Sequence, residues 1–344
     1  MTIGESFHKA ANASGTPTAG RPETGETNTP QAIALHFFAA LAAVMLFLCF
    51  PPALVQQAQA QNNRTVGEIA VNGESPDAPR AQGQNPNGMH IFLWTGLKSH
   101  PDGRHDYPQF LADWSKLLTE HGAVVDGALH APYAADLEHT DVIVLYKGDA
   151  GYLSDSEKAV LEAYIKRGGG IVSLHDSLCG PDPAYFATLV GAGKKHGEVN
   201  YTNPAPVAYT IVDKSNPIMQ GMSNFTIMDE SFYKMTWAKD PAVHVLATAV
   251  IVDSKTIPAV AQHAPEYLGK SVPQIWTYAH TLPGGEPARA FVWMQGDRFA
   301  NFDNYQIQQM LLRGIAWAGK KPVDSLVDYV PPPPMRRGAG LSGQ

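Results

Sequence analysis

The sequence first indicates its fold at Lys166-Arg167-Gly168-Gly169-Gly170-Ile171-Val172-Ser173-Leu174-His175-Asp176-Ser177. Glycine directly after a helix ends that helix, because glycine adopts left-handed backbone angles without steric cost. The apolar run that follows predicts a strand buried on both faces, as in a parallel sheet. Ligands of open α/β sheets bind beyond the carboxyl ends of the strands, so His175 and Asp176 are expected at a functional site. A nucleophile elbow has serine or cysteine at this turn, whereas this chain has histidine.

Composition restricts the class of protein. The chain has 344 residues, of which 44% are hydrophobic and 17% charged, which is typical of a globular protein with an ample core. The formal net charge is -7 and lysine and arginine form no cluster, which argues against a nucleic-acid partner. The two cysteines are Cys49 and Cys179. Cys179 is interpreted as a buried structural thiol.

Residues 1–60 are predicted to be a targeting segment. Residues 32–50 are apolar, and Ala58-Gln59-Ala60 matches the small-x-small pattern of a signal-peptide cleavage site. The apolar run is near the shortest length that spans a bilayer, so an uncleaved N-terminal anchor is the alternative. Both alternatives predict an exported protein, periplasmic or extracellular, that meets the membrane only through this segment. Cleavage would remove Cys49 and leave Cys179 without an intramolecular disulfide partner.

The rest of the chain is predicted to contain one domain. Residues 61–88 are polar and rich in turn-forming residues, which is typical of a flexible linker. Residues 321–344 include Pro331-Pro332-Pro333-Pro334 and are predicted to be an extended, disordered tail. The domain is therefore expected over residues 89–320.

The domain is predicted to be α/β, with a mainly parallel sheet flanked by helices and extra strands in its second half. In the first half, strands at 89–94, 141–146 and 171–174 alternate with helices at 107–120 and 155–167, the second opened by a capping box at Ser154. This alternation predicts parallel strands with right-handed crossovers. The second half has candidate strands at 207–212, 243–250, 257–261, 272–278 and 288–294, and a last helix at 304–318. An antiparallel extension of the sheet is expected there.

Several polar side chains follow the predicted strands. They are His100, His105 and Asp106 after the first strand, His175 and Asp176 after the glycine-rich segment, and Asp297 after the last strand, with His196, Asp229 and Glu230 in loops. If these groups converge, His175 and Glu230 are candidate proton carriers, supported by Asp176 and Asp229. Imidazole titrates near neutral pH, and a neighbouring carboxylate fixes its tautomer and shifts its pKa.

Several segments together resemble the ThuA-like family, named for trehalose utilisation, within the class I glutamine-amidotransferase-like, flavodoxin-like folds. They are Lys98-Ser99-His100, His105-Asp106-Tyr107, Gly168 to His175, Leu189-Val190-Gly191-Ala192, Asn216-Pro217-Ile218 with Gly221, Asp229-Glu230-Ser231-Phe232-Tyr233, Trp276-Thr277 and Leu312 to Ala318. The resemblance covers residues 89–320 in order. One position departs from it, because the family commonly has Gly-His where this chain has Gly296-Asp297. A carboxylate there can still bind zinc or act as a base.

The resemblance implies an enzyme that acts on a sugar or sugar derivative, with hydrolysis, elimination and isomerisation left open. The expected substrate contacts are His100, His105, Asp106, Tyr107, His196, Tyr233, Trp276 and Asp297, with Trp94 interpreted as a core residue. Amidotransferase activity is excluded, since it needs a thiol where His175 stands. A non-catalytic module that binds carbohydrate or a partner protein is the alternative. The oligomeric state is left open.

A divalent metal is a variant of the enzyme hypothesis. The candidate ligands are His100, His105, His175 and His196, and histidine with carboxylate suits zinc or manganese. The sequence has no compact His-x-x-x-His or HExxH spacing, so no particular ligand set is predicted.

Overall fold

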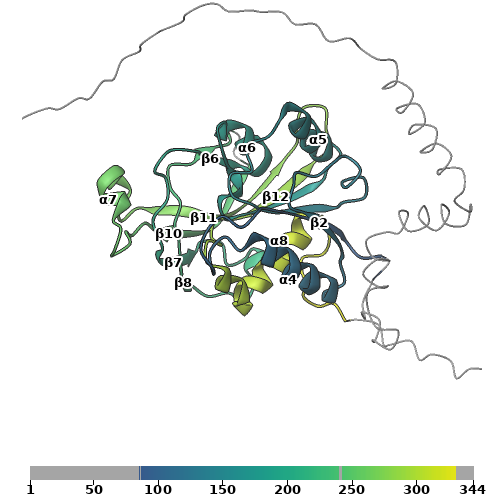
Figure 1. Ribbon diagram of the computed structural model, residues 1–344. Coiled ribbons are helices and arrows are strands. Elements are labelled where there is room, and N and C mark those ends of the chain that lie inside the picture. The colour runs from purple at the N-terminus through teal and green to yellow at the C-terminus, as the bar shows by residue number, and fades with distance from the viewer. Residues whose placement is uncertain (1–84, 86, 240–241, 331–344) are drawn as a thin grey trace, which may run out of the picture. The chain divides into compact units, whose positions relative to one another are not determined.

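A nine-stranded sheet forms the centre of the computed structural model, which describes residues 85, 87–239 and 242–330 (Figure 1). Its strand order is β2-β1-β3-β4-β12-β11-β10-β7-β8. The parallel part consists of β1 (His90–Thr95), β2 (Val124–Ala128), β3 (Val142–Tyr146), β4 (Gly170–Leu174) and β12 (Ala288–Trp293). The antiparallel part consists of β11 (Ser271–His280), β10 (Val243–Val250), β7 (Ala205–Ile211) and β8 (Thr226–Asp229). The predicted α/β fold and its antiparallel extension are confirmed.

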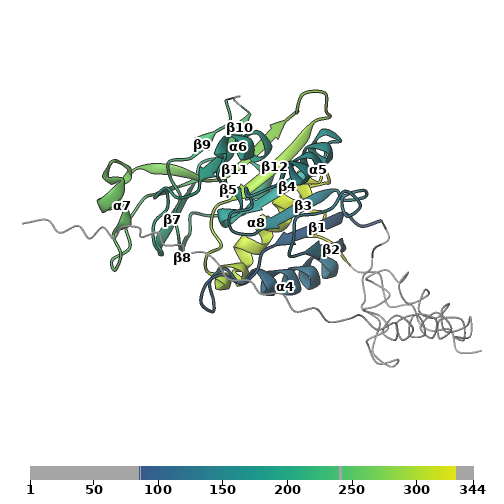
Figure 2. The ribbon, with the colours of Figure 1, turned by 45° about the horizontal axis from the view of Figure 1, so that its top comes forward.

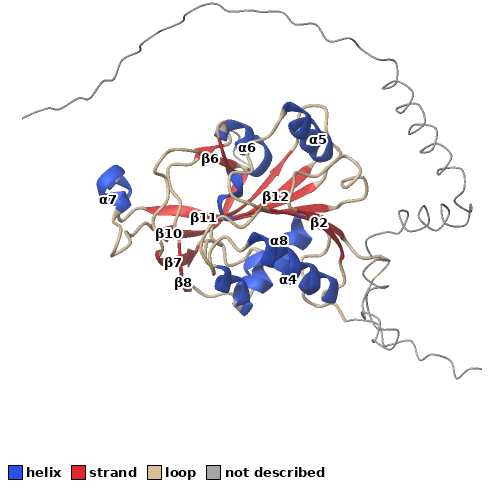
Figure 3. Ribbon diagram, in the orientation of Figure 1, coloured by secondary structure: helices blue, strands red, loops and turns tan. Residues whose placement is uncertain are grey.

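Helices cover both faces of the sheet, as Figure 3 and the turned view in Figure 2 show. The helix α4 (Tyr107–Glu120) and the last helix α8 (Tyr305–Ala318) lie on one face. The helices α5 (Asp155–Lys166) and α6 (Pro183–Val190) lie on the other. A short helix, α7 (Ala259–His263), lies at the antiparallel end of the sheet. A second, small sheet consists of β5 (Cys179–Gly180), β6 (Ala192–Lys195) and β9 (Thr236–Trp237).

The core has two layers because side chains of a strand alternate between its faces. In β1, Ile91 and Leu93 belong to the apolar cluster that contains the buried residues of α4 and α8. Their neighbours Phe92 and Trp94 belong to the cluster that contains those of α5 and α6. Trp94 is 1% exposed, which confirms that it is a core residue. The sheet is thereby held between two helical layers, and its strand ends are left to form a site.

Some elements were not predicted correctly. Residues 257–261, expected as a strand, instead lead into α7, where the Asp253 carboxylate accepts hydrogen bonds from the backbone N–H groups of Val260 and Ala261. The edge strand β2 was missed because it contains Asp126 and Gly127, which are poor strand formers. The helix α6 and the strands β5, β6, β8 and β9 were also missed. Most of them are too short to show a clear hydrophobic period.

The chain continues to pack beyond residue 320. Leu326 is 3% exposed, and its carbonyl oxygen lies 2.6 Å from His121 Nδ1. Arg313 Nε lies 2.6 Å from Asp324 Oδ1. The segments at 1–84 and 331–344, which include the predicted targeting segment, most of the predicted linker and the four prolines, lie outside the described residues. None of the helices in the described part of the chain has the length and apolar character that a membrane span requires.

Candidate functional site

The carboxyl ends of the parallel strands lead to a cavity of about 340 Å³, which we call the histidine pocket. The predicted site residues that line it are His100, His105, His175, Asp176, His196 and Glu230. They come from the loop after β1, the turn after β4, the segment after β6 and the segment after β8. The expected convergence of strand ends therefore brings these residues together.

Two histidines meet at the floor of this pocket. His105 Nε2 and His175 Nε2 are 2.8 Å apart, and His105 Nε2 is 3.3 Å from Asp297 Oδ1. Both histidines have left-handed backbone angles, with φ of 47° at His105 and 55° at His175. Such angles are uncommon for residues with a side chain and occur preferentially at functional sites. Here they direct two imidazoles from separate strand ends towards one point.

The remaining ring nitrogens of the pair also have partners. His175 Nδ1 faces the carbonyl oxygen of Met294 at 3.4 Å, and His105 Nδ1 faces Ser99 Oγ at 3.2 Å. Burial lowers the pKa of His105 to about 3, helped by the positive potential of His100 and Arg104. Burial and the proximity of His105 and Lys194 hold the pKa of His175 well below its usual range. Both imidazoles are therefore neutral near pH 7.

Arg104 links two acidic residues beside the histidines. Its Nε donates to both carboxylate oxygens of Asp297, at 2.9 and 2.7 Å, and its Nη2 donates to Glu230 Oε1 at 3.0 Å. Burial, together with the negative charges of Asp297 and Asp229, raises the pKa of Glu230 to about 9. Arg104 acts in the opposite direction, but its guanidinium is shared with Asp297. Glu230 consequently keeps its proton at neutral pH.

Asp229 was predicted to be catalytic, but it does not line the histidine pocket and is fully buried. Its carboxylate accepts hydrogen bonds from the backbone N–H groups of Glu230, Gly296, Asp297 and Arg298, and from the side chain of Asn301. It therefore fixes the loop after β12, which carries Asp297. We correct its assignment from a catalytic residue to a positioning residue.

Asp176 is paired with a lysine that sequence reasoning did not find. Lys194 Nζ lies 2.5 Å from Asp176 Oδ1, and their side chains are only 6% and 17% exposed. The ammonium group also lies 4.7 Å from the ring centroid of Tyr201 and 4.9 Å from that of Phe232. Such cation–π contacts stabilise a desolvated ammonium group. Lys194 thus places a positive charge in the wall of the pocket.

Removing this lysine is expected to destabilise the fold. Lys194→Met keeps most of the apolar stem but leaves the Asp176 carboxylate buried without its partner, which costs roughly 3 kcal/mol. Urea unfolding monitored by tryptophan fluorescence measures the loss. The double variant Lys194→Met/Asp176→Asn removes both charges and should recover more than half of it. If Lys194→Met unfolds at the wild-type urea concentration, the ion pair does not stabilise the native state.

Other predicted contacts lie outside the pocket. Trp276 is fully buried and donates its indole N–H to the carbonyl oxygen of Val190 at 2.8 Å, and Tyr233 is 1% exposed against Tyr267. The prediction that Trp276 and Tyr233 stack on a ligand is therefore wrong. Tyr107 is 2% exposed, and its ring centroid lies 5.2 Å from that of His105. It therefore packs against the histidine ring on the core side and does not line the pocket. Asp106 precedes α4 and accepts hydrogen bonds from Lys98 and from the backbone of Gly103.

Two groups of described residues have metal-ligand spacing, with all ligand atoms within 4.8 Å of one another. The first contains His105, His175 and Asp297, all of them buried. The second contains Asp149, Cys179 and His196, in which His196 Nδ1 lies 2.8 Å from Asp149 Oδ1. Cys179 is buried, as predicted, and burial raises the pKa of its thiol. His100 belongs to neither group, although its ring contacts that of His105.

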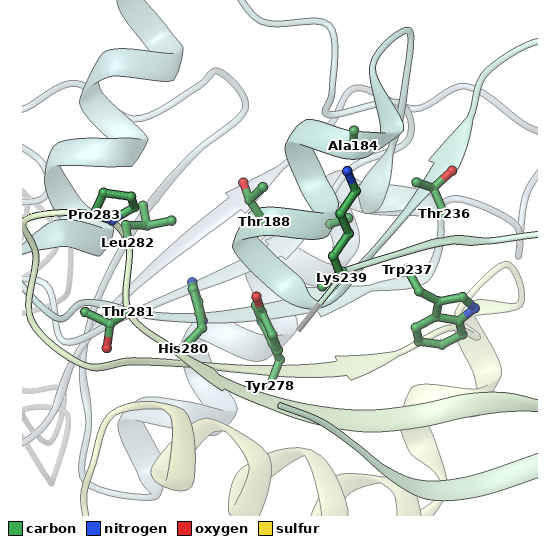
Figure 4. Close-up of a pocket in the computed structure, with 12 residues that line it drawn as sticks. Ala184, Thr188, Thr236, Trp237, Lys239, Tyr278, His280, Thr281, Leu282 and Pro283 are labelled. Carbon is green, nitrogen blue, oxygen red and sulfur yellow. The ribbon is translucent and has the colours of Figure 1, made fainter. Parts of the chain in front are cut away.

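A second cavity, of about 500 Å³, lies between α6, β9 and the end of β11 (Figure 4). In Figure 4, Thr188 of α6 lies across from Tyr278 and His280, whose rings are stacked at 4.3 Å. The described residues that line this cavity include no carboxylate. The histidine pocket contains both carboxyl groups and imidazoles, so it is favoured over this cavity as the candidate active site.

Comparison with known proteins agrees with this architecture. The family model described as "ThuA: Trehalose utilisation" matches residues 94–318. A ThuA-like protein from Bacteroides uniformis has a similar structure, with 16% identity, a TM-score of 0.51, and coverage of 71% of this chain and 95% of that one. One from Parabacteroides merdae has 19% identity, a TM-score of 0.51, and coverage of 68% and 91%. Curated protein sequences give no match. The chain matches the family model over most of its folded part, and it belongs to the ThuA family.

Proposed function

We propose that this protein is an enzyme that acts on a sugar or sugar derivative by proton transfer in the histidine pocket. One arrangement carries the proposal: Glu230, His105 and His175 line the same pocket, where burial raises the pKa of Glu230 to about 9 and lowers the pKa of both imidazoles. Environments that push the pKa values of neighbouring groups apart are typical of acid and base assignments. The family's link to trehalose utilisation supports a sugar as the substrate class.

The roles follow from the hydrogen bonds. Glu230 donates its proton to a leaving or carbonyl oxygen of the substrate, because it is the protonated group that faces the pocket. Met294 accepts the Nδ1 proton of His175, so the lone pair of His175 Nε2 faces His105 and the pocket floor. Hydrolysis, elimination and isomerisation all need one group that accepts and one that donates a proton, so the pocket supports each of them.

The alternative is a module that only binds carbohydrate or a partner. Such a module is expected to present exposed aromatic rings, since sugars stack on flat apolar faces. Among the described residues, Tyr201 lines the histidine pocket with 37% exposure, while Tyr107, Tyr233 and Trp276, the rings expected to contact the substrate, are at most 2% exposed. The pocket offers one exposed ring beside several histidines and carboxyl groups, which favours the enzyme over the binding module.

We also propose that the protein is exported, with a small carbohydrate as its partner and no nucleic acid. The support is the apolar run at 32–50 followed by Ala58-Gln59-Ala60, together with the net charge of -7. Fractionation of cells that express the full-length chain tests export. Recovery of the whole protein in the cytoplasm, with its N-terminus intact, would contradict it.

Glu230→Gln tests the proposed acid. A screen of keto-sugars and disaccharides, with products followed by mass spectrometry, should identify a substrate of the wild-type protein. Wild-type turnover should then fall as the pH rises through about 9, because ionised Glu230 has no proton to donate. Glu230→Gln should lower turnover about 100-fold at pH 7 and remove this alkaline decline.

Glu120→Gln, on the exposed surface of α4, is the matched control and should leave the profile unchanged. A wild-type protein that binds one of these sugars but converts none of them would favour the binding module. An unchanged alkaline decline in Glu230→Gln would assign the acid to another group.

A further inference from the structure

Three potential ligand atoms from three separate strand ends lie close together at the histidine pocket, which His105 and His175 line and beside which Asp297 is buried. His105 follows β1, His175 follows β4 and Asp297 follows β12. Their exposed fractions are 8%, 1% and 0%. His105 Nε2 is 2.8 Å from His175 Nε2 and 3.3 Å from Asp297 Oδ1. Residues so far apart in sequence leave no compact motif, which is why no ligand set was predicted.

The surroundings of each group resemble the outer shell of a metal site. Metal-bound histidine usually donates its other ring N–H to a carbonyl or other oxygen, and a metal-bound carboxylate is itself hydrogen-bonded. His175 Nδ1 faces the Met294 carbonyl oxygen, His105 Nδ1 faces Ser99 Oγ, and Asp297 accepts from Arg104 Nε. These partners turn the Nε2 atoms of both rings towards the same point.

The short distance between the two rings requires either a shared hydrogen atom or a cation between the two nitrogens. The Met294 carbonyl can only accept, so the ring proton of His175 belongs on Nδ1 and its Nε2 carries a lone pair. That lone pair lies 2.8 Å from His105 Nε2. Either a proton on His105 Nε2 or a cation must separate the two nitrogens. The left-handed backbone at both histidines shows that this approach is built into the fold.

We propose that His105, His175 and Asp297 bind one divalent transition-metal ion, of which zinc and manganese are the best candidates. Two imidazoles and a carboxylate suit these ions, and three protein ligands leave a further position for water or substrate, as in catalytic sites. Ligand atoms around one tetrahedral zinc lie roughly 3.3 Å apart, so the two Nε2 atoms would separate by about half an ångström on binding. The second group, with Asp149, Cys179 and His196, is more exposed and is not included.

Metal binding at this site is argued from the geometry alone. Only a role of the metal in catalysis rests on the proposed function. A bound metal ion supplies Lewis-acid polarisation of a sugar oxygen. Glu230, which also lines the pocket but is not in the ligand group, remains the proton donor.

Metal content of the full-length, untagged protein tests the proposal. The protein is stripped with a chelator, exposed to Zn²⁺ or Mn²⁺, desalted, and analysed by inductively coupled plasma mass spectrometry. Wild type and His130→Ala, which changes an exposed histidine, should retain about one equivalent of metal. His105→Ala, His175→Ala and Asp297→Asn should each bind at least roughly 100-fold more weakly. Circular dichroism confirms that the variants are folded.

The visible spectrum of Co²⁺ bound to the wild-type protein gives an independent readout that needs no variant. Tetrahedral nitrogen and oxygen coordination should give intense ligand-field bands, and Zn²⁺ should displace them. Wild-type protein that retains no metal, or folded His175→Ala that binds as tightly as wild type, would overturn the proposal. Turnover without bound metal would leave the proposed function standing alone. Stoichiometric metal without turnover would leave the site standing and contradict the proposed function.

Discussion

Asp229→Ala is expected to lower the free energy of unfolding by roughly 4 kcal/mol, although Asp229 does not line the histidine pocket. The carboxylate accepts five hydrogen bonds, of which the shortest are from Asn301 Nδ2 at 2.6 Å and from the backbone of Glu230 at 2.8 Å. Alanine leaves the buried backbone donors of Glu230, Gly296 and Asp297 without this acceptor, and each unsatisfied donor costs about 1–3 kcal/mol before relaxation. Chemical unfolding of wild type and variant measures the difference.

Asp229→Asn is the matched control. Its amide keeps the volume and one acceptor oxygen but directs an NH₂ group at backbone donors, so an intermediate loss of about 2 kcal/mol is expected. Because the loop after β12 carries Asp297, both variants should also reduce turnover. The reduction should be larger in Asp229→Ala, which loses more stability. Wild-type stability in Asp229→Ala would mean that the hydrogen bonds from Gly296, Asp297 and Arg298 do not hold the loop.

The sequence predicted the parts of the site that depend on strand ends. His175 was identified because three glycines and an apolar run precede it, and the structure places it at a left-handed turn directly after β4. His105 was identified because it follows the first strand in a turn-rich loop. Both inferences use only the rule that ligands bind beyond the carboxyl ends of parallel strands.

The partners of these residues could not be predicted in the same way. Arg104 meets Asp297 across 193 positions of sequence, and Lys194 meets Asp176 only because β6 lies beside β5 in the small sheet. Hydrophobic periodicity reports the buried face of a single helix or strand, so it does not predict contacts between residues far apart in the sequence. The error at Trp276 has a related cause, since an aromatic residue in a strand looks the same from sequence whether it faces the core or a ligand. The position of α6 decides between the two, because the carbonyl oxygen of Val190 accepts the hydrogen bond from the Trp276 indole N–H.

His175→Ala is expected to reduce turnover of the sugar substrate by about 10³- to 10⁴-fold, while the melting temperature changes by only a few degrees. The imidazole is the group that meets His105 Nε2 at 2.8 Å, so its removal eliminates both the lone pair at the pocket floor and the partner of His105. The backbone should be only slightly destabilised, because alanine is somewhat less favourable than histidine at φ of 55°. Water can also fill the space, since the side chain borders the pocket.

His175→Asn separates the chemistry from the backbone strain. Asparagine tolerates left-handed angles better than alanine, so this variant should be at least as stable as His175→Ala. It has no ring nitrogen at the Nε2 position, so its turnover should be reduced just as strongly. His130→Ala, at an exposed position, should change neither quantity. If His175→Asn retained full turnover, the reaction would not need the imidazole. If both variants unfolded, His175 would be a structural residue, and the loss of turnover would not assign it a catalytic role.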